Sequence, residues 1–155
     1  MKNEEIKGLT NIQKSYALAE IQGCNDLTFA YGLSLTETQM IELVEARFNA
    51  LQETGRIEFG HGVLKKLIET FCDSPYLTQE NYLETLFELQ DSFYYFKNES
   101  QELLSDDELI TFMKIYFDGF CQGSTDCLSG TSLEELCRRT RYGDDDMEDE
   151  EMHLF

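Results

Sequence analysis

The sequence is poor in helix breakers and in basic side chains. It has one Pro, no Trp and two His among 155 residues, and 12 Lys and Arg against 31 Asp and Glu. Its 41% hydrophobic content, which includes 8 Tyr and 11 Phe, excludes a wholly disordered chain. The length suffices for one domain with a real core, and the single Pro favours a compact helical fold.

Long apolar runs and paired cysteine motifs are also missing. No stretch approaches the roughly 18 consecutive apolar residues of a membrane span. The first seven residues lack the apolar region of a secretory signal, so we expect none and a cytoplasmic location. Five Cys are odd in number and scattered, which fits free thiols better than a disulfide framework. They are Cys24, Cys72, Cys121, Cys127 and Cys137.

The net charge of −19 is spread over the whole chain. Residues 144–155 hold seven acids and no Lys or Arg, yet residues 1–143 still carry 24 acids against 12 bases. Such a surface repels nucleic acid and anionic membranes and favours a protein partner with a basic surface. We therefore expect neither direct nucleic-acid binding nor membrane binding. The sequence does not indicate an oligomeric state.

Sequence motifs for catalysis and metal binding are absent or incomplete. The chain has no P-loop, GxGxxG or nucleophile elbow. Cys121, Cys127 and Cys137 surround a Gly-rich stretch without a CxxC knuckle, and a zinc site would need a further ligand such as His61. Glu58 and His61 have the Glu-x-x-His spacing of di-iron bundles, but the second motif is absent. We expect no enzyme, cofactor or metal.

Capping residues and apolar spacing predict a series of helices. They start near residues 10, 36, 63, 78, 105 and 131, and they end near 23, 55, 72, 98, 120 and 141. The two most apolar, 79–97 and 106–120, are expected to pack as an antiparallel pair. Residues 27–35 alternate apolar and polar, as in a strand or a packed extended loop, and 56–60 could pair with them.

The predicted fold is an all-α, single-domain bundle of five or six helices over residues 1–143. A variant of this fold adds a minor two-stranded β ribbon near 28–33 and 56–60. Residues 144–155 are expected to form a mobile acidic tail. Leu followed by Thr or Ser recurs at helix starts near 9, 35, 77 and 104 without a fixed period. We interpret this as repeated hydrophobic-staple chemistry rather than a solenoid repeat.

Four consecutive aromatic residues close the helix predicted over 79–97. At about 100° per residue, Phe93, Tyr94, Tyr95 and Phe96 cover most of its circumference. Either other helices wrap this end, which is the usual case, or it presents an aromatic patch to a partner. The candidate partner-binding residues are these four aromatics together with the tail acids Asp144, Asp145, Asp146 and Glu148.

Arg138, Arg139 and Arg141 lie at the end of the last predicted helix. Cations at a helix C-terminus interact favourably with the helix dipole, so pairing within the chain is the preferred interpretation. A basic contact for an acidic partner is the alternative.

Several runs resemble a known family. They are Glu42–Arg47, Thr54–Gly60, Phe71–Tyr76, Phe93–Glu99 and Tyr116–Gly119. Together they are similar to a family of small uncharacterised proteins from anaerobic Gram-positive bacteria, over roughly residues 25–143. The family is a domain of unknown function, so the resemblance implies a bacterial cytoplasmic setting but supplies no activity, cofactor or site residue.

The composition and motifs favour a non-catalytic interaction or adaptor protein that binds a basic partner surface through an acidic face. The alternative is an acidic mimic of nucleic acid that inhibits a DNA- or RNA-binding protein. The weakest alternative is a metal-binding protein or enzyme that uses Cys121, Cys127, Cys137 or His61.

Overall fold

The structure is a computed structural model that describes residues 2–56, 62–100 and 103–142, with side chains described from Ile12 onward except for Gln13. The described part of the chain is helical and contains no strand, as the all-α prediction required. Its elements are α1 (Lys2–Thr28), the 3₁₀ turn η1 (Phe29–Tyr31), α2 (Glu37–Thr54), α3 (Gly62–Phe71), α4 (Tyr82–Glu99), α5 (Asp106–Asp118), α6 (Thr125–Cys127), the π-helical segment η2 (Leu128–Ser132) and α7 (Leu133–Tyr142).

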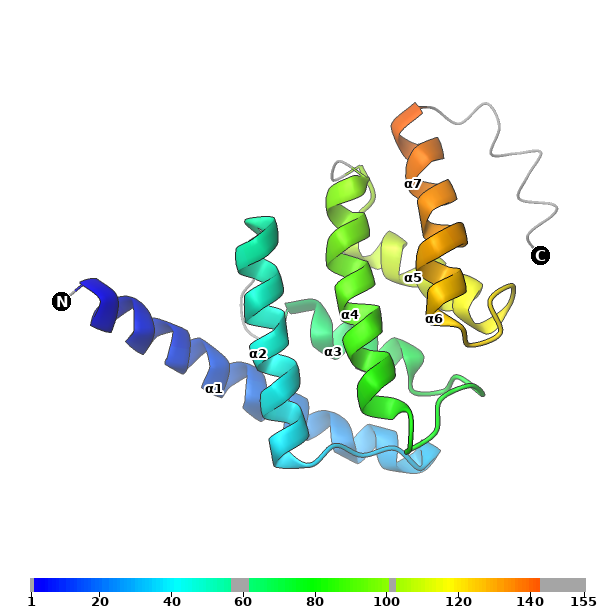
Figure 1. Ribbon diagram of the computed structural model, residues 1–155. Helices are drawn as coiled ribbons and strands as arrows, with labels where there is room; N and C mark the ends of the chain where they lie inside the picture. Colours follow the sequence, from blue (N-terminus) through cyan, green and yellow to red (C-terminus); the bar gives the residue numbers. More distant parts are fainter. Residues whose placement is uncertain (1, 57–61, 101–102, 143–155) are drawn as a thin grey trace.

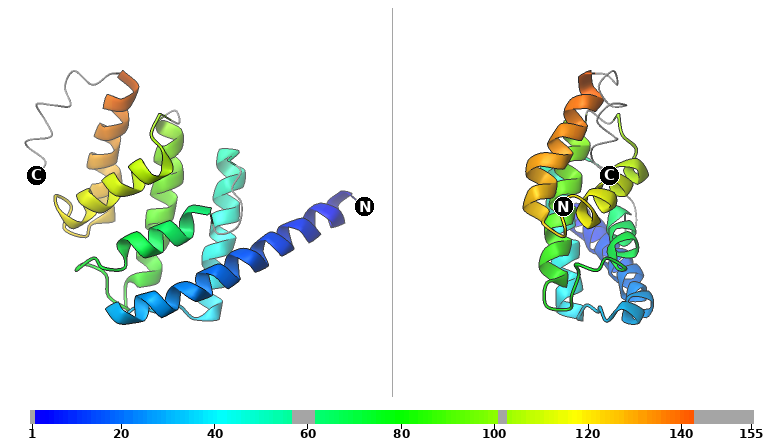
Figure 2. Two further views of the ribbon diagram at one scale, coloured as in Figure 1. Left: turned by 180° about the vertical axis from the view of Figure 1, so that it is seen from behind. Right: turned by 90° about the vertical axis from the view of Figure 1, so that its right-hand side faces the viewer.

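Successive long helices alternate between two layers (Figure 1). Helices α2, α4 and α7 form one layer, and α1, α3 and α5 form the other, as the edge-on view in Figure 2 shows. Within the layers α2 contacts α4, α4 contacts α7, α1 contacts α3 and α3 contacts α5. The chain is therefore a stack of three helix hairpins, α1–α2, α3–α4 and α5–α7, the arrangement by which α-solenoids grow.

Helix α4 lies in the middle of its layer and buries most of its surface. Phe93, Tyr94 and Phe96 are buried, whereas Tyr95 is 55% exposed. The expected contact with α5 exists, but α5 crosses α4 from the other layer rather than running beside it (Figure 1). The neighbours of α4 in its own layer are α2 and α7, so the predicted antiparallel pair is wrong in its geometry.

Two helix starts follow the predicted capping boxes. The Thr36 hydroxyl accepts the Gln39 N–H at 3.1 Å while the Gln39 side chain accepts the Thr36 N–H at 2.9 Å. Ser105 and Glu108 make the same reciprocal pair at 3.1 and 3.0 Å. Gly55 ends α2 at φ +70°, a conformation that side chains with a Cβ rarely adopt.

The start of the central helix was predicted too early. Thr78 makes a reciprocal pair with Asn81 rather than with the first turn of α4: its N–H donates to the Asn81 side chain at 2.8 Å and its hydroxyl accepts the Asn81 N–H at 3.4 Å, within a turn that precedes α4. The Asn81 amide also donates to the Tyr76 carbonyl at 3.1 Å. Because Asn81 draws the backbone into this turn, the helix begins at Tyr82.

The alternating stretch 27–35 is not a strand. Its first residues end α1, which runs through Gly23, and the next three form η1. The Asn25 amide then holds both backbone groups of Leu35 at 3.0 Å, so residues 33–36 form a packed extended loop. Phe29 and Tyr31 point to solvent, whereas Leu33 and Leu35 are buried. The partner segment of the expected ribbon was 56–60; Arg56 is not in a strand, and residues 57–60 lie outside the described residues.

The last helix, α7, begins at Leu133, close to the predicted start near 131, but α6 and η2 precede it directly. Ser124 caps α6 by accepting the Cys127 N–H at 3.1 Å, and the chain continues through η2 into α7 without a break. Thr131 does not act as the N-cap of this helix, because it already lies inside η2. Gly130 sits in the π-helical turn, where the wider winding exposes it.

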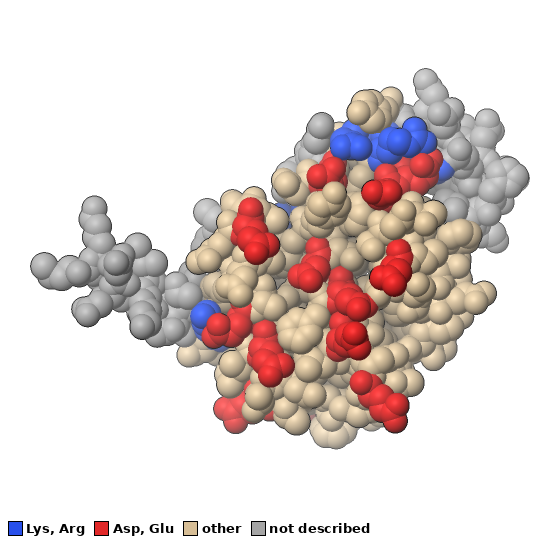
Figure 3. All heavy atoms as spheres, in the orientation of Figure 1, with Lys and Arg blue, Asp and Glu red and all other residues tan. Residues whose placement is uncertain are grey.

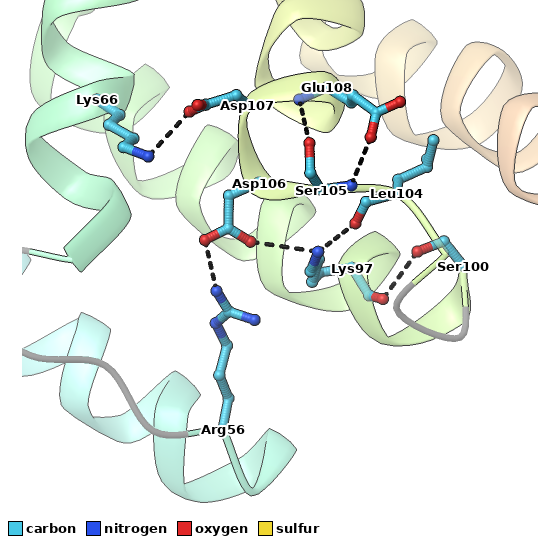
Figure 4. Close-up of polar contacts among 9 residues, drawn as sticks. All are labelled: Arg56, Lys66, Lys97, Ser100, Leu104, Ser105, Asp106, Asp107 and Glu108. Carbon is cyan, nitrogen blue, oxygen red and sulfur yellow. Dashed lines mark hydrogen bonds and ion pairs between the residues drawn. The ribbon is translucent and has the colours of Figure 1, made fainter.

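A polar network joins the C-terminus of α4 to the N-terminus of α5 (Figure 4). The buried Lys97 ammonium donates to the Leu104 carbonyl and lies 3.3 Å from an Asp106 carboxylate oxygen. Arg56, just after α2, contacts the other Asp106 oxygen at 2.7 Å. An outer ion pair joins Lys66 to Asp107 at 2.9 Å. These contacts fix how the second and third hairpins meet.

Candidate interaction surface

The outward side of α4 carries a stripe of three acids and one aromatic ring. Glu84, Glu88, Asp91 and Tyr95 follow one another at intervals of four, three and four residues, which places them on one helix face. Tyr95 packs edge-on against the buried Phe96 ring, with centroids 4.9 Å apart. Its ring is therefore held in place while more than half of the side chain is exposed.

One side of this stripe faces the α2–α4 groove. This groove has a volume of about 470 Å³. From α2 it takes the small side chains Ala46 and Ala50 together with Glu53, and from α4 it takes Asp91 and Tyr95. The small residues leave space between the helices, while the two carboxylates stand at the rim.

The other side of the stripe faces the α4–α7 groove, which lies between α4 and the segment η2–α7. At the level of Tyr95 it has a volume of about 340 Å³ and contains Asp91, Gly130 and Glu134. Further along, Glu99, Glu135, Arg138 and Arg141 line it. Asp91 and Tyr95 thus border both grooves.

Three acids around Tyr95, namely Glu53, Asp91 and Glu134, have no cation among the described side chains to compensate them. Partial burial raises the pKa of the Asp91 carboxyl above its usual 3.8, and the charges of Glu53 and Glu88 raise it further. Among the described side chains, no Lys or Arg pairs with Glu53, Asp91 or Glu134. Figure 3 shows acidic side chains scattered over this face of the molecule, with Lys and Arg at its edges.

The four predicted aromatics do not form one patch. Phe93, Tyr94 and Phe96 belong to the core, and Tyr95 alone of the four presents its ring to solvent. The predicted tail acids Asp144, Asp145, Asp146 and Glu148 lie outside the described residues, so their role stays a prediction.

The acids that the structure adds around Tyr95 were missed. Asp91 and Glu88 could have been found from the sequence, because they precede Tyr95 by four and seven residues on the same predicted helix. Glu53 and Glu134 come from α2 and α7, and no local signal connects them to Tyr95.

The arginines at the end of α7 pair with acids of the same chain. Glu135 contacts Arg138 at 2.5 Å and Arg139 at 3.0 Å, and Glu99 contacts Arg141 at 3.5 Å. The pKa of Glu135 is lowered, chiefly by its hydrogen bond with Arg138. These contacts agree with the preferred interpretation of intrachain pairing.

The three C-terminal cysteines occupy different surroundings. The Cys121 thiol lies 3.5 Å from the Ser132 hydroxyl and contacts Cys127, whereas Cys137 donates to the Phe96 carbonyl at 3.5 Å. Burial raises the pKa values of Cys121 and Cys137 to about 11, so both thiols are protonated at neutral pH and are weak nucleophiles. His61 lies outside the described residues.

The described part of the chain offers neither a metal-binding cluster nor a membrane-spanning helix. No group of three or more His, Cys, Asp and Glu side chains is arranged to hold a metal ion. None of the helices there is sufficiently long and apolar to cross a bilayer.

Comparison with known proteins gives one match. Residues 20–146 match a family described as a family of unknown function, DUF6323. No curated protein and no solved structure matches the chain.

Proposed function

The chain belongs to DUF6323, a family of unknown function, and from its surface we propose that it is a non-catalytic interaction protein that binds a basic segment of a protein partner. The binding surface is the outer face of α2, α4 and α7, with Tyr95 at its centre.

The observation that carries this proposal is the pairing of an exposed, fixed aromatic ring with uncompensated acids. Tyr95 is 55% exposed and stands between two grooves rimmed by Glu53, Asp91 and Glu134. Aromatic rings and carboxylates together bind cationic side chains, the first through the ring face and the second through ion pairs. Tyr is also among the residues enriched at interface hot spots.

The fold supports the same role. Stacked helix hairpins create extended surfaces made of parallel helices, and many such proteins use these surfaces to bind partners. Here the layer of α2, α4 and α7 is one such surface (Figure 2). This part of the argument is an analogy between folds, and the chemistry of Tyr95 and the acids specifies the partner.

Affinity capture with the full-length protein tests the proposal. The protein would be incubated with an extract of its own cells at low and at high salt, and each retained protein would then be purified and measured separately. We expect a basic partner whose affinity falls about tenfold or more for Tyr95→Ala, the size of an interface hot spot.

Tyr31→Ala is the matched control, because Tyr31 is 50% exposed but lies in η1 and lines neither of the two grooves beside Tyr95. We expect this variant to bind as the wild type does. A purified partner whose affinity is the same for Tyr95→Ala and the wild type would contradict the proposal.

The spread of acids over the face in Figure 3 favours one further candidate, a mimic of nucleic acid. A mimic occupies the groove of a DNA- or RNA-binding protein through many charges, so its affinity falls steeply with salt. A nucleic-acid-binding partner that salt releases, and that tolerates Tyr95→Ala, would favour this candidate.

A further inference from the structure

We propose, on the basis of the binding role above, that the α4 surface recognises an extended segment bearing two arginines three positions apart. One guanidinium enters the α2–α4 groove and the other enters the α4–α7 groove, so that the segment passes over the Tyr95 ring.

The spacing follows from helix packing. Packed helices lie about 8–10 Å apart, and the two grooves flank the same helix, so their midlines are separated by about that distance. In polyproline II conformation every third residue faces the same side, and three residues advance by about 9.3 Å. In a β-strand, side chains on the same side are separated by about 6.7 Å for two residues or about 13 Å for four, and neither value matches the separation of the groove midlines.

An α-helical occupant fits less well. Residues seven apart on a helix are separated by about 10.5 Å, but the helix is about 10 Å wide. Tyr95 stands exposed between the grooves, so it would hold such a helix off the layer. An extended backbone crosses the ring and lets its side chains descend on both sides.

The chemistry favours arginine over lysine. A guanidinium is planar, so it can stack on Tyr95 and bond a carboxylate through two N–H groups at once. Each groove provides such carboxylates: Glu53 and Asp91 in one, Asp91 and Glu134 in the other. Because Asp91 borders both grooves, it can contact either cation. A cation there would also relieve the repulsion among Asp91, Glu53 and Glu88.

Short labelled peptides provide the test, with fluorescence anisotropy on the full-length protein at physiological salt. Three of the peptides contain two arginines separated by one, two or three prolines, so they have equal charge and differ in spacing. A fourth peptide replaces both arginines of the two-proline peptide by lysine. A fifth is an alanine-based helix with two arginines seven positions apart.

We expect the peptide with two intervening prolines to bind at least about fivefold more tightly than the other four, the effect of one additional well-placed cation–π contact. Tyr95→Ala should remove this preference, and Tyr31→Ala should retain it. Asp91→Asn should weaken the two-proline peptide more than Glu69→Gln, which changes the same charge on α3 in the other layer.

The outcomes separate the two proposals. If all peptides bind equally through a Tyr95-dependent site, or if the helix binds best, the two-arginine rule is overturned while the basic-partner proposal stands. If no cationic peptide binds at any spacing, both proposals are overturned.

Discussion

Two acidic sites of the fold, Asp106 at the start of α5 and Asp91 on α4, have opposite surroundings. At the C-terminus of α4, Asp106 contacts Lys97 at 3.3 Å and Arg56 at 2.7 Å (Figure 4). Near the middle of α4, Asp91 has Glu53 and Glu88 as its charged neighbours and sits at the rim of two grooves. The first site contributes to the fold, because its charges are neutralised by the chain itself.

The second site costs stability, because like charges gather where no cation of the described chain compensates them. Proteins keep such locally unfavourable arrangements mainly at functional sites. The contrast supports the proposal that the Asp91 site binds a partner, whereas the contacts of Asp106 stabilise the fold. Substitutions at the two sites should change stability in opposite directions.

The largest expected effect is at the paired site. Lys97→Met removes a buried ammonium that holds both Asp106 and the Leu104 carbonyl. Removing the cation of a buried ion pair leaves the Asp106 carboxylate less well compensated. We therefore expect the free energy of unfolding to fall by about 3 kcal/mol. Urea denaturation followed by circular dichroism measures this loss.

Lys66→Met is the control at the same junction, because the Lys66–Asp107 pair is exposed. Its cost should stay below about 1 kcal/mol. Equal losses for the two variants would mean that burial does not distinguish the inner pair from the outer one.

The next effect concerns the capping box beside the same network. Ser105→Ala removes the hydroxyl that accepts the Glu108 N–H at 3.1 Å, and we expect a loss of about 1 kcal/mol. Ser105→Thr keeps the hydroxyl and should retain most of the stability. If the Thr variant is as unstable as the Ala variant, the cap does not explain the loss.

The smallest effect has the opposite sign and lies at the uncompensated site. Asp91→Asn removes a charge that Glu53 and Glu88 repel, so the free energy of unfolding should rise, by less than about 1 kcal/mol because the side chain is exposed. The same substitution should weaken binding of the cationic peptide.

The gain should depend on pH. The folded pKa of Asp91 is raised, so the folded state binds its proton more tightly than the unfolded state does. The contribution of Asp91 is therefore most favourable below pH 3.8 and declines as pH rises through the raised pKa. Urea denaturation at several pH values should show the advantage of Asp91→Asn growing with pH; an advantage that shrinks would contradict the assignment.

Much of the fold could be predicted because its signals are local. The capping boxes at Thr36 and Ser105, and the stop at Gly55, each depend on residues within one turn. The errors arose where hydrogen bonds from one side chain determined the backbone conformation of residues several positions away. Asn81 does this before α4, and Asn25 does it before α2. No local pattern predicted the stacking of the hairpins, because the residues that make these contacts do not recur at a fixed interval in the sequence.

The candidate surface could be predicted in part. The aromatic run identified Tyr95, but whether one of four rings is exposed depends on which neighbours cover α4. The acids from α2 and α7 reach Tyr95 through the packing of helices that are distant in sequence. Their role therefore required the three-dimensional structure.

The position of α4 within its layer has a mechanical consequence. Helices at the ends of a stack have a neighbour on one side and open more readily than those in the middle. Helix α4 has α2 on one side and α7 on the other, so Tyr95 and Asp91 lie on an element that is flanked on both sides. The walls of the two grooves can shift while their shared centre stays in place, which gives the surface a fixed anchor and an adjustable width.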